Sequence, residues 1–339
     1  MSDHRKTLPR SARWGLASLS LSMLMPSLDT SIANIGLPTL AQTFDATFQD
    51  VRWVVLAYLI AITALIVSAG RLGDLFGRRR LLLAGIALFT LTSLFCGIAP
   101  ALGWLIAARA AQGLGAAIMM SLTIAMIGET VPKERTGSAM GLLGTMSAIG
   151  TSLGPSLGGV LITAMGWQTI FLINVPLGVL NLWLAWRYLP ADKVSAAPVS
   201  GIDIKGTLTL TAALAAYALA LTTSHLGLAS AILLTVAFVS VGAFVYIEKR
   251  AAAPLVQLAM FRDAGLSISL MISSVIATVM MATLVVGPFY LSRTLGLPPV
   301  SVGLVMSVGP ILSAAGGVVA GRLVDRFGAA TTIVVGLLA

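Results

Sequence analysis

The sequence predicts an all-α protein that crosses a membrane many times. Three observations predict this class: 58% of the residues are hydrophobic, only 10% are charged, and the mean hydropathy is +0.98. Soluble domains contain roughly 25% charged residues, and a membrane-spanning helix needs about 20 consecutive, mostly apolar residues. Apolar runs of that length recur along the chain. We therefore expect a polytopic bundle of helices in a bilayer.

The apolar runs give the expected helices in order. They cover residues 14–38, 53–70, 81–99, 102–124, 139–164, 168–188, 206–223, 228–247, 266–290 and 301–321. A further run begins at Thr331 and stops with the chain, so we expect a C-terminally truncated protein whose last helices are absent. The first run is too long for a cleavable signal peptide and has no small-residue cleavage site. Short connections predict that consecutive helices are antiparallel neighbours.

The net charge of +9 raises the question of a nucleic-acid partner, and the position of the charges answers it. When alternate loops are assigned to opposite sides of the membrane, every Lys and Arg except Arg52, Arg109 and Arg293 falls on one side. This distribution is typical of the cytoplasmic side of membrane proteins. We therefore expect a cytoplasmic N-terminal tail (residues 1–13), the lipid bilayer as a partner, and no nucleic acid.

Residue types that carry enzymatic or metal chemistry are sparse. Cys96 is the single cysteine, and its place inside an apolar run indicates packing. His4 and His225 lie outside the runs, and no cluster of Cys, His and carboxylate has the spacing of a metal site. The chain also has no GxxxxGK[ST] stretch. We expect no metal, no cofactor and no enzymatic activity.

Two charges lie deep inside apolar runs, where each costs about 2.5–3.5 kcal/mol on insertion scales. Asp29 and Arg109 are at depths that differ by roughly 3 Å at 1.5 Å per residue, so antiparallel helices could bring them together. Each residue has two interpretations. Arg109 is either a functional charge or a structural cation bound by backbone carbonyls. Asp29 is either a functional charge or a group that is hydrogen-bonded at a helix end. Asn34 and Gln112, in the same two runs, would hydrogen-bond to a substrate or to each other.

Small residues cluster in the run 139–164. Glycines four residues apart permit close contact between helices, and a proline removes a backbone hydrogen bond and favours a kink. The residues concerned are Gly150, Gly154, Pro155, Gly158 and Gly159. We expect this helix to pack unusually closely against a neighbour.

A charged stretch, "GRLGDLFGRRR" (residues 70–80), joins two apolar runs on the arginine-rich side. Its arginines anchor the topology. The glycines and the acid add a second role, because an acid that pairs with an arginine or a helix N-terminus can latch one group of helices to another. A weaker copy, "GRLVDRFGAA", follows at 321–330. The expected latch residues are Gly70, Asp74, Gly77, Arg78, Asp325 and Arg326.

These stretches resemble the signatures of a known family. Residues 70–80 resemble the loop signature G-x-L-x-D-x-x-G-R-[RK] of the major facilitator superfamily, and "RAAQGLGAA" (109–117) and "GTSLGPSLGG" (150–159) resemble its helix 4 and antiporter motifs. "LDTSIANIGLP" (28–38) and "IFLINVPLG" (170–178) resemble the 14-helix drug:proton antiporter family of that superfamily. The chain is identified as a member of this family.

The resemblance implies a fold of two parallel six-helix halves. The second charged stretch arrives two helices later than such a repeat predicts, so we expect an inserted pair of central helices. The expected parts are a tail (1–13), an N-terminal six-helix bundle (14–190), the inserted pair with its flanking loops (191–265), and the start of the C-terminal bundle (266–339).

The resemblance also implies a function. It is a proton-coupled antiporter that exports amphipathic or cationic small molecules across the bacterial inner membrane, as in multidrug efflux and drug resistance, by alternating access. Asp29 and Arg109 would couple to protons, and the helix at 150–159 would seal the interface between the halves. A lipophilic substrate, protons and a periplasmic adaptor protein are the implied partners. The alternatives are a uniporter or symporter for a small metabolite, and a membrane scaffold or sensor without transport.

Overall fold

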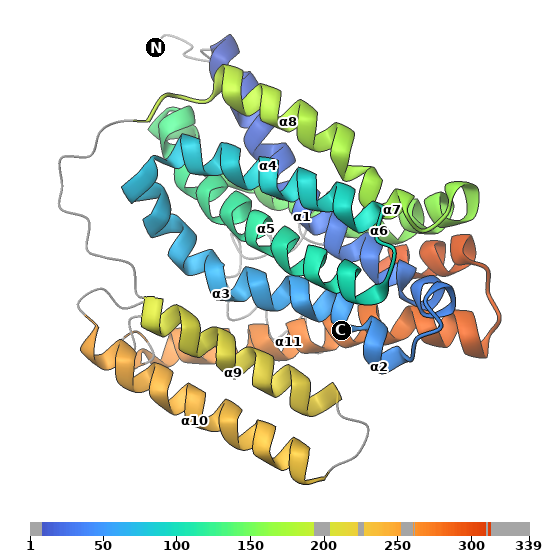
Figure 1. The fold of residues 1–339 in the computed structure, drawn as a ribbon. Coiled ribbons are helices and arrows are strands. Elements are labelled where there is room, and N and C mark those ends of the chain that lie inside the picture. The colour runs from blue at the N-terminus through green and yellow to red at the C-terminus, as the bar shows by residue number, and fades with distance from the viewer. Residues whose placement is uncertain are drawn as a thin grey trace.

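The protein is described by a computed structural model that covers residues 9–192, 204–222, 227–251, 260, 262–309 and 311–312. Every regular element in these ranges is helical (Figure 1). Among the described residues, seven helical segments are long and apolar enough to cross a membrane, by length and composition: Phe48–Phe76, Arg78–Gly97, Leu102–Thr130, Thr136–Met165, Thr169–Tyr188, Leu228–Arg250 and Ala264–Thr294. The chain is therefore built as a multi-pass membrane protein.

The first bundle is formed by eight helices, of which two are single turns. Its elements are α1 (Arg10–Thr43), α2 (Phe48–Val51), α3 (Trp53–Phe76), α4 (Arg78–Gly97), α5 (Leu102–Thr130), α6 (Thr136–Met165), α7 (Thr169–Leu172) and α8 (Asn174–Tyr188). A short 3₁₀ turn, Lys133–Arg135, leads into α6. α1 lies inside the bundle and packs against α5, α6 and α8 (Figure 1).

α1 is the longest helix, yet it is not among the seven apolar segments. Its interior position explains this, because a helix surrounded by protein can carry polar side chains that lipid would not solvate. The buried polar side chains of α1 are Ser18, Ser20, Ser22, Asp29, Ser31 and Asn34. The helix that carries the candidate carboxylate is thus the polar axis of the bundle.

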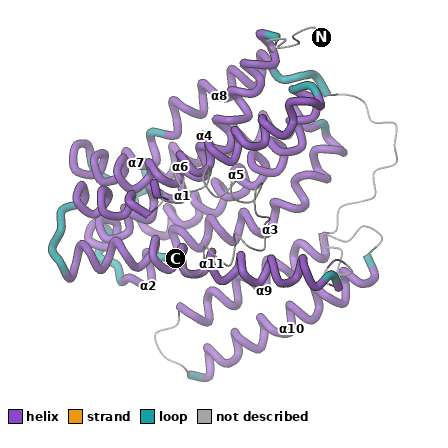
Figure 2. Tube along the Cα trace, turned by 180° about the vertical axis from the view of Figure 1, so that it is seen from behind, coloured by secondary structure: helices purple, strands orange, loops and turns teal. Residues whose placement is uncertain are grey.

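The later helices lie outside this bundle. α9 (Ile204–Thr222) and α10 (Leu228–Arg250) lie side by side, and α9 packs against α3, where Ser68 Oγ and Thr207 Oγ1 are 2.9 Å apart (Figure 2). α11 (Ala264–Phe289) packs against α1 and continues into a π-helical turn, Tyr290–Thr294. A further apolar helix spans Pro299–Gly309.

The first nine expected helices have counterparts among the described residues, with their ends displaced. The run 301–321 is described only in part, as Pro299–Gly309, and the run from Thr331 lies outside the described residues. α3 extends beyond the apolar run through Arg71 and Asp74, and it ends at Gly77, whose φ of +94° an L side chain rarely adopts. The stretch 70–80 is therefore the last turns of α3, one connecting glycine and the start of α4. The run 168–188 is divided at Ile173, since Pro176 in the first turn of α8 cannot donate to an earlier carbonyl.

The hydrophobic core of the first bundle has two parts, and α1 passes through both. One contains Leu19, Met23 and Met25 of α1, and the other contains its Ile32–Ala41 segment. Between them α1 carries Leu28 and Asp29, which are also buried. The core thus excludes water on both sides of one carboxylate, and it sets the environment of the candidate site.

Candidate functional site

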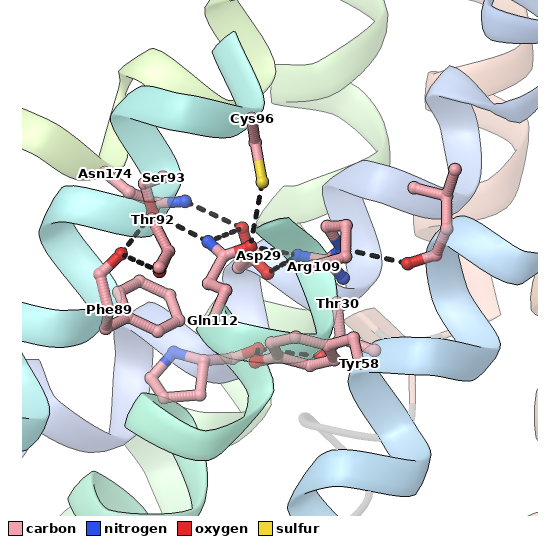
Figure 3. A network of polar contacts seen from close by, with 12 residues as sticks. Asp29, Thr30, Tyr58, Phe89, Thr92, Ser93, Cys96, Arg109, Gln112 and Asn174 are labelled. Carbon is pink, nitrogen blue, oxygen red and sulfur yellow. Dashed lines mark hydrogen bonds and ion pairs between the residues drawn. The ribbon is translucent and has the colours of Figure 1, made fainter. Parts of the chain in front are cut away.

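Asp29 of α1 and Arg109 of α5 meet in the middle of the bundle (Figure 3). Arg109 Nη1 donates to Asp29 Oδ2, and both side chains are 0% exposed. Neither residue lies at a helix end, so hydrogen bonding at a helix terminus does not account for Asp29. The polar contacts around this pair, from Asp29, Ser93, Arg109, Gln112 and Asn174, are named here the Asp29 network.

The other carboxylate oxygen accepts two side-chain amides. Gln112 Nε2 donates to Asp29 Oδ1 at 3.0 Å, and Asn174 Nδ2 donates to the same oxygen at 2.8 Å. Asp29 therefore faces three N–H donors from α5 and α8 (Figure 3). Charge-assisted hydrogen bonds of this kind stabilise an ionised carboxylate in a site without water.

Arg109 is also held by the backbone and by aromatic rings. Its Nε donates to the carbonyl of Val54 at 3.0 Å, which is the backbone bond expected of a structural cation. Its Cζ lies 4.0 Å from the ring centroid of Tyr58 and 5.6 Å from that of Phe171. The groups that hold Arg109 thus also aim it at Asp29, and its role in proton coupling stays a prediction.

Gln112 is fully used within the network. Its Oε1 accepts from Arg109 Nη1 at 2.6 Å and lies 3.6 Å from Cys96 Sγ, and its Nε2 reaches Ser93 Oγ at 2.6 Å. Gln112 therefore orients the ion pair. Of the two alternatives for Asn34 and Gln112, a bond between them does not form, and a bond to a substrate stays a prediction. Asn34 is fully buried, and neither atom of its amide has a hydrogen-bond partner among the described residues.

Sequence reasoning did not assign Asn174 or Asn181, both on α8. Asn181 accepts from Ser18 Oγ and donates to Ser22 Oγ, each at 2.8 Å, which binds α8 to α1 two turns away from the Asp29 contact. Asn174 lies in the motif "IFLINVPLG". A polar side chain in an apolar run of this kind indicates a buried hydrogen-bonding position. α8 thus presents two asparagines to α1 on one face.

The glycines of α6 face two different neighbours. Gly150, Gly154 and Gly158 lie against α1, and a Cβ on Gly154 would fall 2.5 Å from Ser31 Cβ. Gly159 lies against the backbone of Pro299, and the Ser156 N–H donates to Ser307 Oγ at 3.1 Å. The carbonyl of Pro155 approaches Gly303 closely. α6 is therefore in close contact both within the bundle and with the helix that follows α11.

Around Gly77, five residues from three segments form what is named here the Gly77 cluster: Asp74, Gly77, Arg78, Glu129 and Asp192. Arg78 pairs with Asp74 and with Glu129, each at 2.8 Å, and these side chains are between 26% and 42% exposed. Glu129, at the end of α5, was not assigned from the sequence.

Asp192 caps α4 at this cluster. Its Oδ1 accepts the Arg79 N–H at 2.7 Å, and its Oδ2 accepts the Arg80 N–H at 3.3 Å. The helix N-terminus is therefore bound by Asp192, while Asp74 pairs with Arg78. The second charged stretch, with Asp325 and Arg326, lies outside the described residues.

Comparisons with known proteins agree with this architecture. The family model described as Major Facilitator Superfamily matches residues 19–339. Multidrug resistance protein Stp of Mycobacterium tuberculosis is 32% identical over 327 residues, which cover 95% of this chain and 60% of Stp. Riboflavin transporter RibZ of Clostridioides difficile is 30% identical over 319 residues, which cover 93% of this chain and 68% of RibZ.

A crystal structure of a D-xylose-proton symporter has the same fold, with a TM-score of 0.59 at 17% identity over 92% of this chain and 69% of that one. The chain spans 60% of the length of Stp. The family match covers most of the chain, and the fold and the relatives agree with it. The chain therefore belongs to the major facilitator superfamily and is a multi-pass membrane protein.

Proposed function

We propose that the protein is a proton-coupled antiporter that exports amphipathic or cationic small molecules by alternating access, as in multidrug efflux. The observation that carries the proposal is the Asp29 network, in which a fully buried carboxylate is paired with a fully buried arginine inside the bundle. Buried intramembrane charges are expensive, and transporters use them for ion coupling. The relative Stp, named as a multidrug resistance protein, supports the same class of substrate.

The network offers a cycle based on one acid. In the ionised state, Arg109, Gln112 and Asn174 hold the Asp29 carboxylate. A proton that binds Asp29 removes its charge and weakens the pair with Arg109. When the proton leaves, the carboxylate can attract either Arg109 or a cationic substrate. Proton and substrate then compete for one group, which couples their movements in opposite directions.

The contact between the bundle and the later helices supports alternating access. α6 meets the helix Pro299–Gly309 at Pro155 and Gly159, and the rings of Phe48 and Phe289 are 4.4 Å apart between their centroids. One end of the interface is therefore closed, as a gate would be in one state of the cycle.

We further propose that the N-terminus is cytoplasmic and the membrane is the bacterial inner membrane. Arg10 and Arg13 begin α1, and Arg78, Arg79 and Arg80 begin α4. Consecutive spanning helices alternate in direction, so the starts of α1 and α4 lie on the same side of the membrane. The positive-inside rule assigns these arginines, and with them the N-terminus, to the cytoplasmic side. A reporter that is active only in the cytoplasm, fused to the N-terminus, should be active; a periplasmic reporter that is active there would contradict the orientation.

The proposed coupling is tested by transport in inverted membrane vesicles that contain the full-length protein. Asp29→Asn should abolish efflux of a cationic dye driven by an imposed pH gradient when efflux is compared at equal amounts of folded protein, because Arg109 loses its buried counter-charge in this variant. Asp45→Asn is the matched control, since Asp45 is an exposed acid just after α1 and should leave efflux normal. Normal gradient-driven efflux by Asp29→Asn would overturn the assignment of the proton site.

A second candidate is a facilitator or symporter for a small metabolite, and the relative RibZ, named as a riboflavin transporter, favours it. The two functions differ in the response to the pH gradient. An antiporter accumulates dye in inverted vesicles only when their interior is acidic. For a uniporter, accumulation in the vesicles does not depend on the pH gradient. A proton symporter drives accumulation only when the vesicle interior is alkaline.

A further inference from the structure

Two side-chain atoms of the Asp29 network have no hydrogen-bond partner among the described residues: Arg109 Nη2, which can only donate, and Asn174 Oδ1, which can accept. The side chain of Asn174 is fully buried, and its Nδ2 donates to Asp29 Oδ1 at 2.8 Å (Figure 3). Its Oδ1 is buried and has no partner within the part of the chain that the structure describes. A buried amide oxygen without a partner is unfavourable, so its retention calls for a physical reason.

A proton on Asp29 changes what the carboxyl group needs. An ionised carboxylate only accepts hydrogen bonds, whereas a carboxylic acid has one O–H that needs an acceptor. Arg109 has no acceptor atom. The Gln112 oxygen already accepts from Arg109 at 2.6 Å and is contacted by Cys96. Among the neighbours of Asp29 in the network, the Asn174 oxygen is the acceptor still available.

The other groups around Asp29 do not replace it. Tyr58 Oη donates to the carbonyl of Pro26 at 3.3 Å, and Thr30 Oγ1 donates to the same carbonyl at 2.8 Å. α6, α7 and α11 contain no titratable side chain. The titratable groups on the other elements packed against α1 are Asp50 on α2, Tyr58, Arg71 and Asp74 on α3, Arg109 and Glu129 on α5, and Arg187 and Tyr188 at the far end of α8. Cys96 of α4 contacts Gln112.

We propose that Asn174 is a two-state positioning residue for Asp29. Its amide N–H donates to the ionised carboxylate, and after a half-turn of the amide its oxygen accepts the O–H of the protonated acid. The two orientations fill nearly the same space, because an amide oxygen and an NH₂ group differ little in size. No covalent bond other than the Asp29 O–H forms or breaks. The proposal rests on the proposed function, since it assumes that Asp29 takes up a proton.

α8 holds Asn174 in place for both orientations. Asn181, two turns along α8, is bound to Ser18 and Ser22 of α1 at 2.8 Å each. Gly178, about 40° around α8 from Asn174, lets α8 approach Thr90 of α4 closely. The side-chain amide of Asn174 can therefore rotate while its helix stays fixed, and Asn181 supplies a matched control on the same helix pair.

The test is the infrared difference spectrum between acidic and alkaline pH, measured on the full-length protein in lipid bilayers. The carboxylic C=O band of Asp29 is the one that Asp29→Asn removes. Asn174→Leu removes the acceptor for the acid O–H, so this band should move to higher frequency. Asn181→Leu disturbs the α1–α8 contact without touching Asp29, and the band should stay where it is in the unsubstituted protein.

Three results would overturn the proposal. An unchanged band in Asn174→Leu would show that the amide oxygen does not accept from the acid. Equal shifts in Asn174→Leu and Asn181→Leu would show a general packing effect. A spectrum without any band that Asp29→Asn removes would show that Asp29 does not take up a proton, and this outcome removes the proposed function as well. The first two outcomes leave the proposed function intact.

Discussion

The Asp29 network and the Gly77 cluster are built from the same chemistry in opposite surroundings. In each, one arginine pairs with an acid: Arg109 with Asp29, and Arg78 with Asp74 and Glu129. The side chains of Asp29 and Arg109 are each 0% exposed, whereas that of Arg78 is 34% exposed and that of Asp74 is 42% exposed. Two unit charges 4 Å apart attract by about 1 kcal/mol in water and about 4 kcal/mol at the effective dielectric constant of a protein.

The difference suits the two roles we propose. Breaking an exposed pair changes stability by about 0–1 kcal/mol, so the Gly77 cluster can open and close within a transport cycle. Removing one partner of a buried pair costs about 3–5 kcal/mol, because the remaining charge is left without a counter-charge or water. The Asp29 network can therefore separate only when something else, a proton or a cationic substrate, replaces the lost partner.

The largest expected effect is the removal of Arg109. Arg109→Ala should lower the free energy of unfolding by about 3–5 kcal/mol, since Asp29 would be left buried without its cation. Unfolding can be followed by a thiol-reactive dye, because Cys96 is the only cysteine and is fully buried. Arg109→Lys should restore part of the stability and of transport, since a lysine keeps the charge but loses the forked geometry.

A double variant isolates the charge effect in Arg109→Ala. Adding Asp29→Asn removes the uncompensated carboxylate, so the double variant should be more stable than Arg109→Ala alone. Arg78→Ala is the exposed counterpart and should lower the unfolding free energy by no more than about 1 kcal/mol. If Arg109→Ala were no more harmful than Arg78→Ala, the contrast between the two regions would fail.

The geometry of the turn at Gly77 gives the next effect. Gly77→Ala should lower the free energy of unfolding by at least about 1–2 kcal/mol, because φ is +94° and a Cβ would lie 2.5 Å from Asp192 Oδ2. Gly128→Ala is the matched control, since a Cβ there meets no described atom within 4 Å and lies within α5. It should be neutral or stabilising by up to about 1 kcal/mol. Equal effects of the two substitutions would contradict the strain at Gly77.

The encounter of Asp29 with Arg109 was predictable because depth along a helix follows from residue counting. The angular position of each residue around its helix follows from the same counting, and the expected bond between Asn34 and Gln112 disagrees with it. Asn34 lies five residues after Asp29, so it points about 140° away around the helix and could not join Gln112 beside Asp29. Gln112 lies three residues after Arg109, about 60° away, and it shares the network.

Residue counting along one helix does not predict which helices distant in sequence contact each other. Asn174, Glu129 and Asp192 act through neighbours on α1 and α4, and nothing local indicates which helices are adjacent. The charged stretch 70–80 was interpreted as a loop because its charges end the apolar run. In the structure the helices continue through those charges, because helix ends depend on backbone geometry at Gly77 and capping by Asp192.

The cap on α4 gives a smaller effect within the Gly77 cluster. Asp192→Ala should lower the free energy of unfolding by about 1 kcal/mol, because two backbone N–H groups lose their acceptor. Asp192→Asn keeps an oxygen that can cap and should be near neutral. The ion pair with Arg80 contributes little, since its atoms are 3.8 Å apart and Arg80 is 82% exposed. A loss in Asp192→Asn as large as in Asp192→Ala would mean that charge, and not capping, is what matters.

The smallest expected effect on stability is at Asp74, and there function and stability should separate. Asp74→Asn should change the unfolding free energy by no more than about 1 kcal/mol, because Arg78 keeps its bond to Glu129 and the pair is exposed to solvent. Dye efflux should nevertheless fall if the cluster is a latch, since the balance between open and closed states depends on differences of this size. The comparison is made at equal membrane levels of variant and unsubstituted protein. Full efflux by Asp74→Asn would leave the cluster with only its role as a topological anchor.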